Sequence, residues 1–247
     1  RVMPDGADEV ARLARSFNAM AAELEQQHIR RRDLVRDVAH ELRTPLTALR
    51  CRLESILDGM ARDSQQALAG ANEEVHHLSR LVDDLQELAL AEARELSLTL
   101  EDVRVADVAA SAVQAAGLGD DLRIRLEVPR ELTVRADATR LRQVLLNLLT
   151  NADRYTPEGG AITLRGARVA GQIRIEVHNT GSALDDGQLQ RIFDRFYRTD
   201  EARQRSTGGS GLGLAIAKHL IEAQGGDVSA TSDASGVTVR CALPTAD

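Results

Sequence analysis

The sequence has little of several features that would indicate other kinds of protein. It holds two cysteines, Cys51 and Cys241, in 247 residues. Two are too few for a disulfide-stapled chain of this size, and they fit a reducing compartment. No window offers about 18 uninterrupted apolar residues, so no membrane-spanning helix is predicted. The first residues are polar and do not form the apolar region of a signal peptide.

Positive charge is also scarce, because 31 Lys and Arg stand against 38 Asp and Glu, for a net charge of −7. This balance argues against a direct nucleic-acid partner, since phosphate-binding surfaces need clustered basic charge. The length suits one to three domains of about 150 residues each and allows a buried core, which excludes overall disorder. The chain begins without an initiator Met, so we expect a fragment whose upstream part could include membrane spans.

The composition changes near residue 97, after which fifteen of the 18 glycines occur. Before that point, apolar residues recur in alternating steps of three and four, which predicts two long helices with a break at residues 58–64. A second copy of this hairpin would complete a four-helix bundle, so a homodimer is predicted. The alternative is that the hairpin packs on the chain's own second domain. The shared core of the dimer would contain Leu42, Leu49, Leu78 and Leu85.

After residue 97, short strands are mixed with helices. Alternating apolar residues predict strands at 122–128, 161–164, 173–177 and 237–243. Helices are predicted at 105–116, 138–155, 185–193 and 212–224. The fold class is therefore α+β: a helical-hairpin dimerisation domain, followed by an α/β sandwich in which helices cover one face of a mixed sheet.

The first long helix contains the segment His40-Glu41-Leu42-Arg43-Thr44-Pro45-Leu46. A mid-helix proline costs about 3 kcal/mol, because it removes a backbone hydrogen bond and clashes with the preceding turn. We expect a kink there and a His40 side chain that points out of the bundle. A lone exposed histidine is usually only solvated, but the adjacent Glu41, the nearby Thr44 and the costly proline favour a functional one.

Asn147 and Asn151 are four residues apart on an otherwise apolar predicted helix, so their amide oxygens can converge on one face. Oxygen ligands suit Mg²⁺, which completes its shell with water and phosphates. Surface hydrogen bonding is the simpler explanation of such a pair.

Gly208-Gly209-Ser210-Gly211-Leu212-Gly213-Leu214 opens another apolar helix. Glycines let the backbone approach phosphates, and a helix N-terminus offers N–H groups to anionic oxygens. A flexible linker would show the same pattern. The polar stretch 195–207 before it is typical of a mobile lid, with Phe193 and Phe196 as its anchors or as ordinary core aromatics.

Taken together, these segments resemble the boxes of sensor histidine kinases. Residues 40–46 match the phosphoacceptor box at every position, and residues 147–155 and 208–214 resemble the asparagine box and the lid of the ATP-binding domain. The resemblance implies ATP and Mg²⁺ as cofactors, with His40 as the phosphorylated residue. It makes Glu41 the general base or the holder of the imidazole tautomer, and Thr44 the residue that orients water in dephosphorylation. The implied nucleotide-binding residues are Asn147, Asn151, Arg154, Tyr155, Asn179, Gly181, Phe193, Phe196, Gly209, Gly211, Leu212 and Gly213, with Asn151 and Asn147 as metal ligands.

One box departs from the family, because Asn179-Thr180-Gly181-Ser182-Ala183 stands where most members have Asp-x-Gly-x-Gly. A neutral acceptor for the adenine amino group weakens binding by about tenfold. A non-catalytic dimeric scaffold with a decayed nucleotide site is therefore the alternative function. A plain ATPase is a third, disfavoured because hydrolytic relatives commonly carry Glu at the position of Asn147.

Residues 8–20 resemble the second helix of a HAMP linker. The resemblance implies three domains: a HAMP end and signalling helix at 1–29, a dimerisation and phosphotransfer hairpin at 30–96, and an ATP-binding domain at 97–247. It also implies the cytoplasmic portion of an inner-membrane kinase that passes its phosphoryl group to a response-regulator Asp and also acts as a phosphatase. The segments 81–85 and 195–199 are closest to the envelope-stress sensors of the family.

Overall fold

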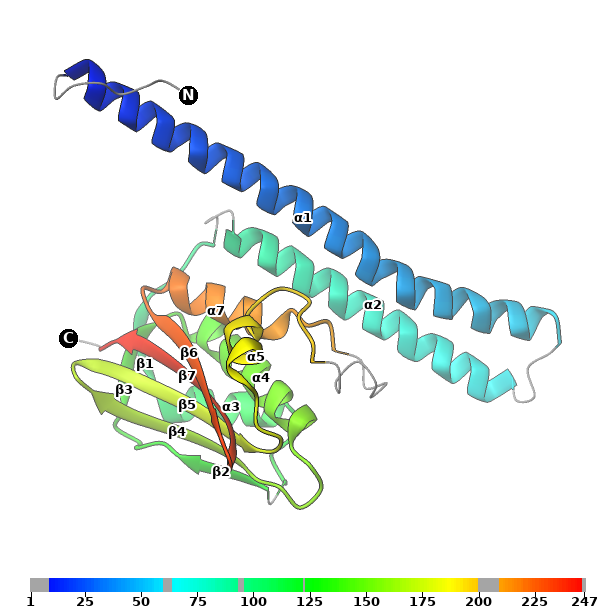
Figure 1. Ribbon diagram of the computed structural model, residues 1–247. Helices are drawn as coiled ribbons and strands as arrows, with labels where there is room; N and C mark the ends of the chain where they lie inside the picture. The colour runs from blue at the N-terminus through cyan, green and yellow to red at the C-terminus, as the bar shows by residue number, and fades with distance from the viewer. Residues whose placement is uncertain (1–8, 60–63, 93–95, 122, 200–208, 246–247) are drawn as a thin grey trace. The chain divides into compact units, whose positions relative to one another are not determined.

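The computed structural model describes residues 9–59, 64–92, 96–121, 123–199 and 209–245. The chain forms two compact units, Arg1–Leu78 and Ser79–Asp247 (Figure 1). Helix α2 (Ser64–Glu92) contributes residues to both. Among the described helices, none combines the length and the apolar character needed to cross a membrane.

The first unit contains the long helix α1 (Glu9–Leu57) and the start of α2. The predicted break at 58–64 is confirmed, since α1 ends at Leu57 and α2 begins at Ser64. The two helices are neighbours in this unit, because the Arg52 guanidinium occupies the space beside Gly70 where a side chain would stand. Helix α1 continues on both sides of Pro45, so the proline does not end it.

Apolar side chains remain on the outside of both helices in the single chain. Leu46 and Leu53 of α1 are 59% and 42% exposed, and they are seven residues apart. On α2, Leu68, Val75 and Val82 are exposed at the same spacing. A spacing of seven keeps side chains on one helix face, so each helix presents an apolar stripe. The four leucines assigned to the shared core, Leu42, Leu49, Leu78 and Leu85, are half-buried.

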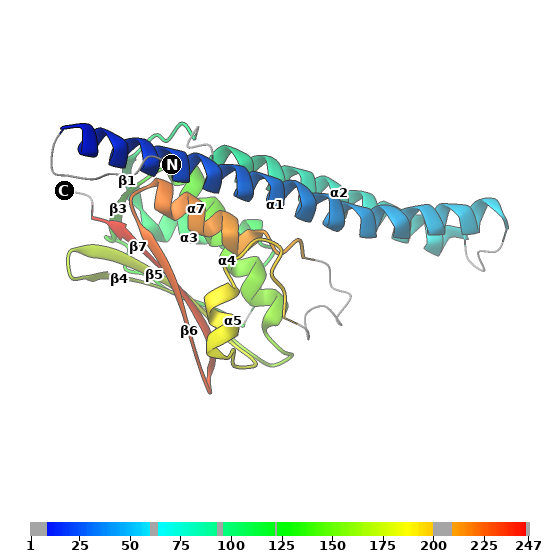
Figure 2. The ribbon, with the colours of Figure 1, turned by 45° about the horizontal axis from the view of Figure 1, so that its top comes forward.

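The second unit is built on a five-stranded sheet in the order β2-β4-β5-β7-β6. Among the strands in the described part of the chain, the β2–β4 pairing is parallel and the other three pairings of this sheet are antiparallel, so the predicted mixed sheet is confirmed. Helices α3, α4 and α7 cover one face of it, as Figures 1 and 2 show. The strands are β2 (Ile124–Glu127), β4 (Ile162–Val169), β5 (Gln172–Thr180), β6 (Asp227–Asp233) and β7 (Gly236–Pro244), and the helices are α3 (Val105–Ala115), α4 (Ala138–Tyr155), the short α5 (Asp186–Arg191) and α7 (Gly213–Ala223).

The two faces of the sheet differ as strand alternation requires. On the covered face, Ile173, Ile175 and Cys241 are buried, and burial raises the pKa of the Cys241 thiol to about 12. On the other face, Nε of Arg165 lies 2.5 Å from a Glu127 carboxylate oxygen, and Arg240 makes the same contact with Glu176. The core therefore lies between the sheet and the three helices.

Three strands were not predicted. The strands β1 (Glu101–Arg104) and β3 (Thr133–Ala136) pair into a separate two-stranded antiparallel sheet. The third, β6, is the outermost strand next to β7 and carries mostly small polar residues. The strands β1 and β3 are four-residue segments, too short for a regular apolar alternation, and β6 has few apolar residues, which is why the sequence pattern missed them.

Helix α4 begins at a well-satisfied cap. The Asp137 carboxylate accepts hydrogen bonds from the backbone N–H groups of Thr139 and Arg140, both at 3.0 Å. It also accepts from the N–H of Thr99 at 2.9 Å. Burial alone would raise the pKa of Asp137, but these donors outweigh it and hold the pKa below the ordinary 3.8.

Replacing this cap, Asp137→Ala, is expected to lower the free energy of unfolding by about 1 to 2 kcal/mol. The control Asp137→Asn keeps a side-chain oxygen that can cap and should lose much less. Because the folded pKa is depressed, the charge of Asp137 stabilises the fold above pH 3.8 and that stabilisation is lost as the pH falls further. Urea denaturation measures the free energy of unfolding at pH 7 and at pH 3. The difference in this free energy between wild type and Asp137→Ala should be smaller at pH 3.

Candidate active site

The second unit has a cavity of about 110 Å³ between the helices and the end of the sheet. Three of the predicted nucleotide-binding residues, Asn151, Tyr155 and Asn179, line it. The remaining lining residues are Ser182, Leu184, Ile192, Tyr197, Arg198, Thr199, Leu214, Val237 and Val239. Those nine were missed as site residues, although the alternation along 237–243 already placed Val237 and Val239 on one face of a strand.

The Asn179 side chain is the polar member of an apolar row. It is 6% exposed on β5, on the same face as the buried Ile175 and Val177. Its Nδ2 donates a long hydrogen bond, 3.4 Å, to the carbonyl oxygen of Thr180. The predicted neighbour Gly181 must be a glycine for steric reasons, since a Cβ there would approach the Tyr155 carbonyl oxygen to 2.8 Å.

Asn147 and Asn151 lie one turn apart on α4, as predicted. Among the described residues, Nδ2 of Asn147 is buried without a hydrogen-bond partner. A Cβ at Gly213, the first residue of α7, would sit 3.8 Å from the Asn147 side chain, so the two helices are in contact here. The described part of the chain contains no group of three or more His, Cys, Asp or Glu side chains that could hold a metal ion.

The glycine-rich turn before α7 lies against the end of α4. The guanidinium of Arg154 occupies the space beside Gly209, where a side chain at 209 would overlap it. Gly211 has φ +70°, and its carbonyl oxygen accepts a hydrogen bond of 2.9 Å from the N–H of Phe196. Leu212, fully buried, is the N-cap residue of α7. The turn thus brings Gly209, Gly211, Leu212 and Gly213 together with Arg154 and Asn147.

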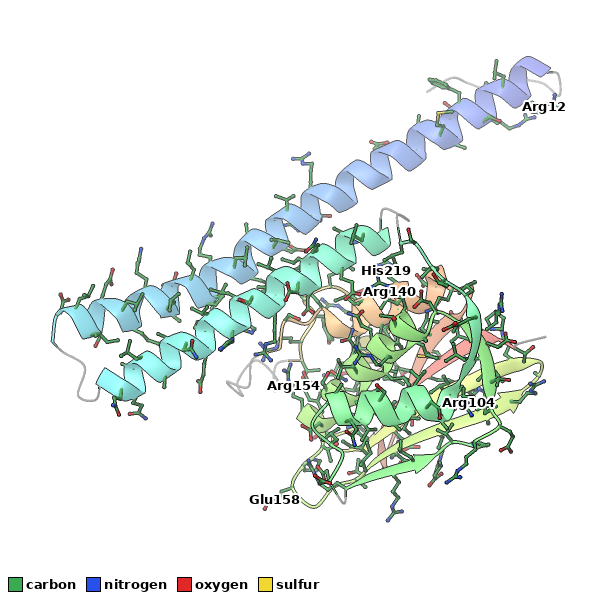
Figure 3. The ribbon with its side chains drawn as sticks, turned by 180° about the vertical axis from the view of Figure 1, so that it is seen from behind. Arg12, Arg104, Arg140, Arg154, Glu158 and His219 are labelled. Carbon is green, nitrogen blue, oxygen red and sulfur yellow. The ribbon has the colours of Figure 1, made fainter. Side chains whose placement is uncertain are left out.

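Positive charge accumulates at this turn. Loss of hydration lowers the pKa of the Arg154 guanidinium, and the nearby cations Arg198 and Arg80 act in the same direction. Figure 3 shows Arg154 and Arg140 on α4, of which Arg154 belongs to its last turn. A concentration of guanidinium groups next to a glycine-rich helix N-terminus is suited to bind phosphate oxygens.

The two predicted anchor phenylalanines do not line the cavity. Phe193 is half-buried, with the Lys218 ammonium 6.0 Å from its ring centroid. Phe196 is also half-buried and holds φ +58° through its hydrogen bond to Gly211. Their contacts connect the segment after α5 to α7 and its turn.

Two acidic side chains in the part of α2 that belongs to this unit were not predicted as site residues. Asp84 accepts a hydrogen bond of 2.8 Å from the hydroxyl of Ser210, in the glycine-rich turn. Glu87 accepts from Arg140 at 2.9 Å and from the amide of Gln143. Burial raises the pKa of Glu87, although the nearby Arg140 cation opposes the change.

The phosphoacceptor-like segment lies in the first unit, on α1. The His40 side chain is 76% exposed in the single chain, as the predicted outward orientation requires. Its Nδ1 lies 3.6 Å from a Glu41 carboxylate oxygen, which is longer than a hydrogen bond. Thr44 is exposed one turn later on the same helix. An exposed imidazole nitrogen can act as a nucleophile, and an adjacent carboxylate can orient the ring.

Comparisons with known proteins find three family models along the chain. The HAMP domain matches residues 1–26, the His Kinase A (phospho-acceptor) domain matches residues 30–94, and the histidine kinase-, DNA gyrase B- and HSP90-like ATPase family matches residues 136–247. Three motifs therefore fall inside matched family regions: the phosphoacceptor-like segment at 40–46, the asparagine segment at 147–155 and the glycine-rich segment at 208–214.

Individual proteins of similar sequence are also found. The signal transduction histidine-protein kinase BaeS of Escherichia coli K12 is 37% identical over 99% of this chain and 53% of its own length. The sensor histidine kinase CusS of Escherichia coli O157:H7 is 36% identical over 96% of this chain and 50% of its own. The chain thus spans about half the length of these curated relatives.

Solved structures share the fold. The histidine kinase AdeS of Acinetobacter baumannii superposes with a TM-score of 0.71 at 26% identity, covering 84% of this chain and 98% of that one. Full-length ShkA in complex with AMPPNP gives a TM-score of 0.61 at 29% identity, covering 87% of this chain and 46% of that one.

Proposed function

Since this chain belongs to the sensor histidine kinase family, we propose that it phosphorylates His40 with ATP and then transfers the phosphoryl group to an aspartate of a response regulator. The observation that carries the proposal is the presence, in one chain, of an exposed His40 and of a separate cavity with a cationic, glycine-rich turn in the same unit. Such a pairing supplies an acceptor and a phosphoryl-donor site, whereas an ATPase or a scaffold would not require the acceptor.

At the acceptor, the proposed nucleophile is the ring nitrogen that does not face Glu41. The Glu41 carboxylate lies 3.6 Å from Nδ1, and on closer approach it would accept a hydrogen bond from the Nδ1 proton and leave the lone pair on Nε2. Nε2 forms the bond to the γ-phosphorus while the bond from that phosphorus to the bridging oxygen breaks and ADP leaves. Glu41 thus positions the imidazole, and Thr44 would orient a water molecule when the regulator is dephosphorylated.

At the nucleotide site, the adenine base would be bound by Asn179, Gly181 and Tyr155. The triphosphate would lie against the turn formed by Gly209, Gly211, Leu212 and Gly213 and against Arg154. The phenylalanines Phe193 and Phe196 would position the segment that precedes this turn. The protein contributes by positioning and by charge neutralisation rather than by covalent chemistry at phosphorus.

Asn147 and Asn151 are the proposed magnesium ligands. The donor set fits, because neither amide makes a side-chain hydrogen bond within the described residues and both lie on one face of α4. Two amide oxygens leave the remaining positions to water and phosphate, which is how Mg²⁺ is usually held. Bound there, the ion would neutralise charge on the transferred phosphoryl group.

The proposed assembly is a homodimer through the α1–α2 hairpin, with domain boundaries near residues 29 and 96. The HAMP match at residues 1–26 supports a place next to the membrane, so we assign the chain to the cytoplasmic side of an inner-membrane sensor. The response regulator is the proposed second partner, and removal of its phosphoryl group by the same protein is part of the proposal.

Incubation of the full chain with γ-labelled ATP tests the function. We expect label on the protein that is lost in acid and retained in base, as a phosphoramidate bond requires. Release of labelled phosphate without labelled protein would instead support an ATPase. Neither label nor phosphate release would support the non-catalytic scaffold.

A further inference from the structure

Asn179 has hydrogen-bonding capacity that the protein itself does not use. The side chain is 6% exposed and lines the cavity. Its Nδ2 has one long bond, 3.4 Å, to the carbonyl oxygen of Thr180, and no described residue donates to its Oδ1. Because the side chain lines the cavity and its Oδ1 accepts from no described residue, this hydrogen-bonding capacity is available to a ligand in the cavity.

An amide at this place offers what a carboxylate cannot. An ionised carboxylate only accepts hydrogen bonds, whereas an asparagine amide accepts through Oδ1 and donates through Nδ2. At the corresponding ring position adenine carries an amino donor and guanine a carbonyl acceptor. A carboxylate therefore pairs with adenine and repels guanine, while an amide can pair with either after a turn of its terminal group.

Resting on the proposed nucleotide site, we propose that this chain binds guanosine as well as adenosine triphosphates, with Asn179 as the residue that permits both. With adenine, Oδ1 accepts from the base amino group and Nδ2 keeps its bond to the Thr180 carbonyl. With guanine, the amide turns over, Nδ2 donates to the base carbonyl and the Thr180 bond is lost. The Ser182 hydroxyl, which belongs to a residue lining the same cavity, offers an acceptor for the amino group of guanine.

The preference between the two bases follows from the bond that guanine binding breaks. At 3.4 Å, the Asn179–Thr180 contact is at the long limit for an N–H···O bond, so its loss costs little. The wild-type chain should then favour the adenine nucleotide by no more than roughly tenfold. A site that faces guanine with a buried carboxylate should discriminate by at least about a hundredfold, because an acceptor is left opposite an acceptor.

Calorimetric titration of the full chain with AMPPNP and with the corresponding guanosine analogue tests the proposal. We expect dissociation constants within about tenfold of each other for wild type. Binding of AMPPNP with discrimination of a hundredfold or more against the guanosine analogue would overturn the base tolerance and leave the proposed kinase function intact. Failure of both analogues to bind would instead count against the proposed nucleotide site.

The variant Asn179→Asp assigns the effect to this residue. It should bind AMPPNP several-fold more tightly and lose at least about tenfold in affinity for the guanosine analogue. The matched control Asn72→Asp makes the same chemical change at an exposed position of α2 and should alter neither constant. If Asn179→Asp melts like wild type and the ratio of its dissociation constants for the two analogues is unchanged, Asn179 does not take part in base recognition. If the variant does not fold, the ratio of the two dissociation constants measured for wild type still decides the proposal.

Discussion

The variant His40→Gln is expected to take up no label from γ-labelled ATP while binding AMPPNP as wild type does. A glutamine amide nitrogen has no available lone pair, so the proposed bond to phosphorus cannot form. Nucleotide binding should survive, because His40 lies in the first compact unit and the cavity lies in the second. Labelled protein is measured after electrophoresis, and the dissociation constant is measured by calorimetry.

A matched control is available on the neighbouring helix. His76 is an exposed histidine of α2, and His76→Gln should leave labelling at the wild-type level. Persisting label in His40→Gln would show that another side chain is the acceptor. Loss of AMPPNP binding in that variant would contradict the assignment of acceptor and nucleotide to separate units.

Elements with a long and regular apolar period were predictable from sequence. The helix predicted at 138–155 coincides with α4, because its apolar face supplies six fully or almost fully buried side chains. Strand β4 extends to Val169, beyond the predicted end at 164. The prediction stopped early because Arg165 is charged and Gly166 interrupts the apolar alternation. The four-residue β1 buries a single side chain, Val103, and no period can be recognised in so short a segment.

Part of the candidate site was predictable for a different reason. Asn151 and Tyr155 lie on a helix that the apolar period predicted, whereas Asn179 lies beyond the predicted strand 173–177 and was assigned by resemblance; all three line the cavity. Ser182 and Tyr197 lie in irregular segments, where periodicity gives no direction. The contacts of Asp84 and Glu87 join residues 126 and 53 positions apart in the chain, and such pairings depend on how α2 packs rather than on any local pattern.

A charged residue in the apolar stripe of the hairpin is expected to abolish the proposed dimer. Leu53 is 42% exposed in the single chain and is seven residues from Leu46, which is 59% exposed, so a second copy is the partner that would bury it. In Leu53→Asp, two-fold symmetry places the substitution at the interface twice. Each uncompensated buried charge costs several kcal/mol, so the dissociation constant should rise by at least about a thousandfold.

Leu53, in the exposed apolar stripe, is a better position for the charged substitution than the half-buried leucines. Leu49 and Leu85, assigned to the shared core by their spacing, are already partly covered in the single chain, so a charge there would also disturb the hairpin. A substitution at Leu53 acts mainly on the contact between copies, because less of its side chain is covered before association. The two kinds of substitution therefore separate loss of the dimer from loss of the fold.

Small-angle scattering and sedimentation at micromolar concentration measure the outcome. Wild type should be a dimer and Leu53→Asp a monomer with an unchanged helical circular-dichroism signal. Cys51→Arg is the matched control, since Cys51 is exposed on α1 two residues earlier and about 200° around the helix from Leu53. That variant should remain dimeric. A dimeric Leu53→Asp would show that the copies associate through another face, and the exposed leucines of α1 would then need a different partner to cover them.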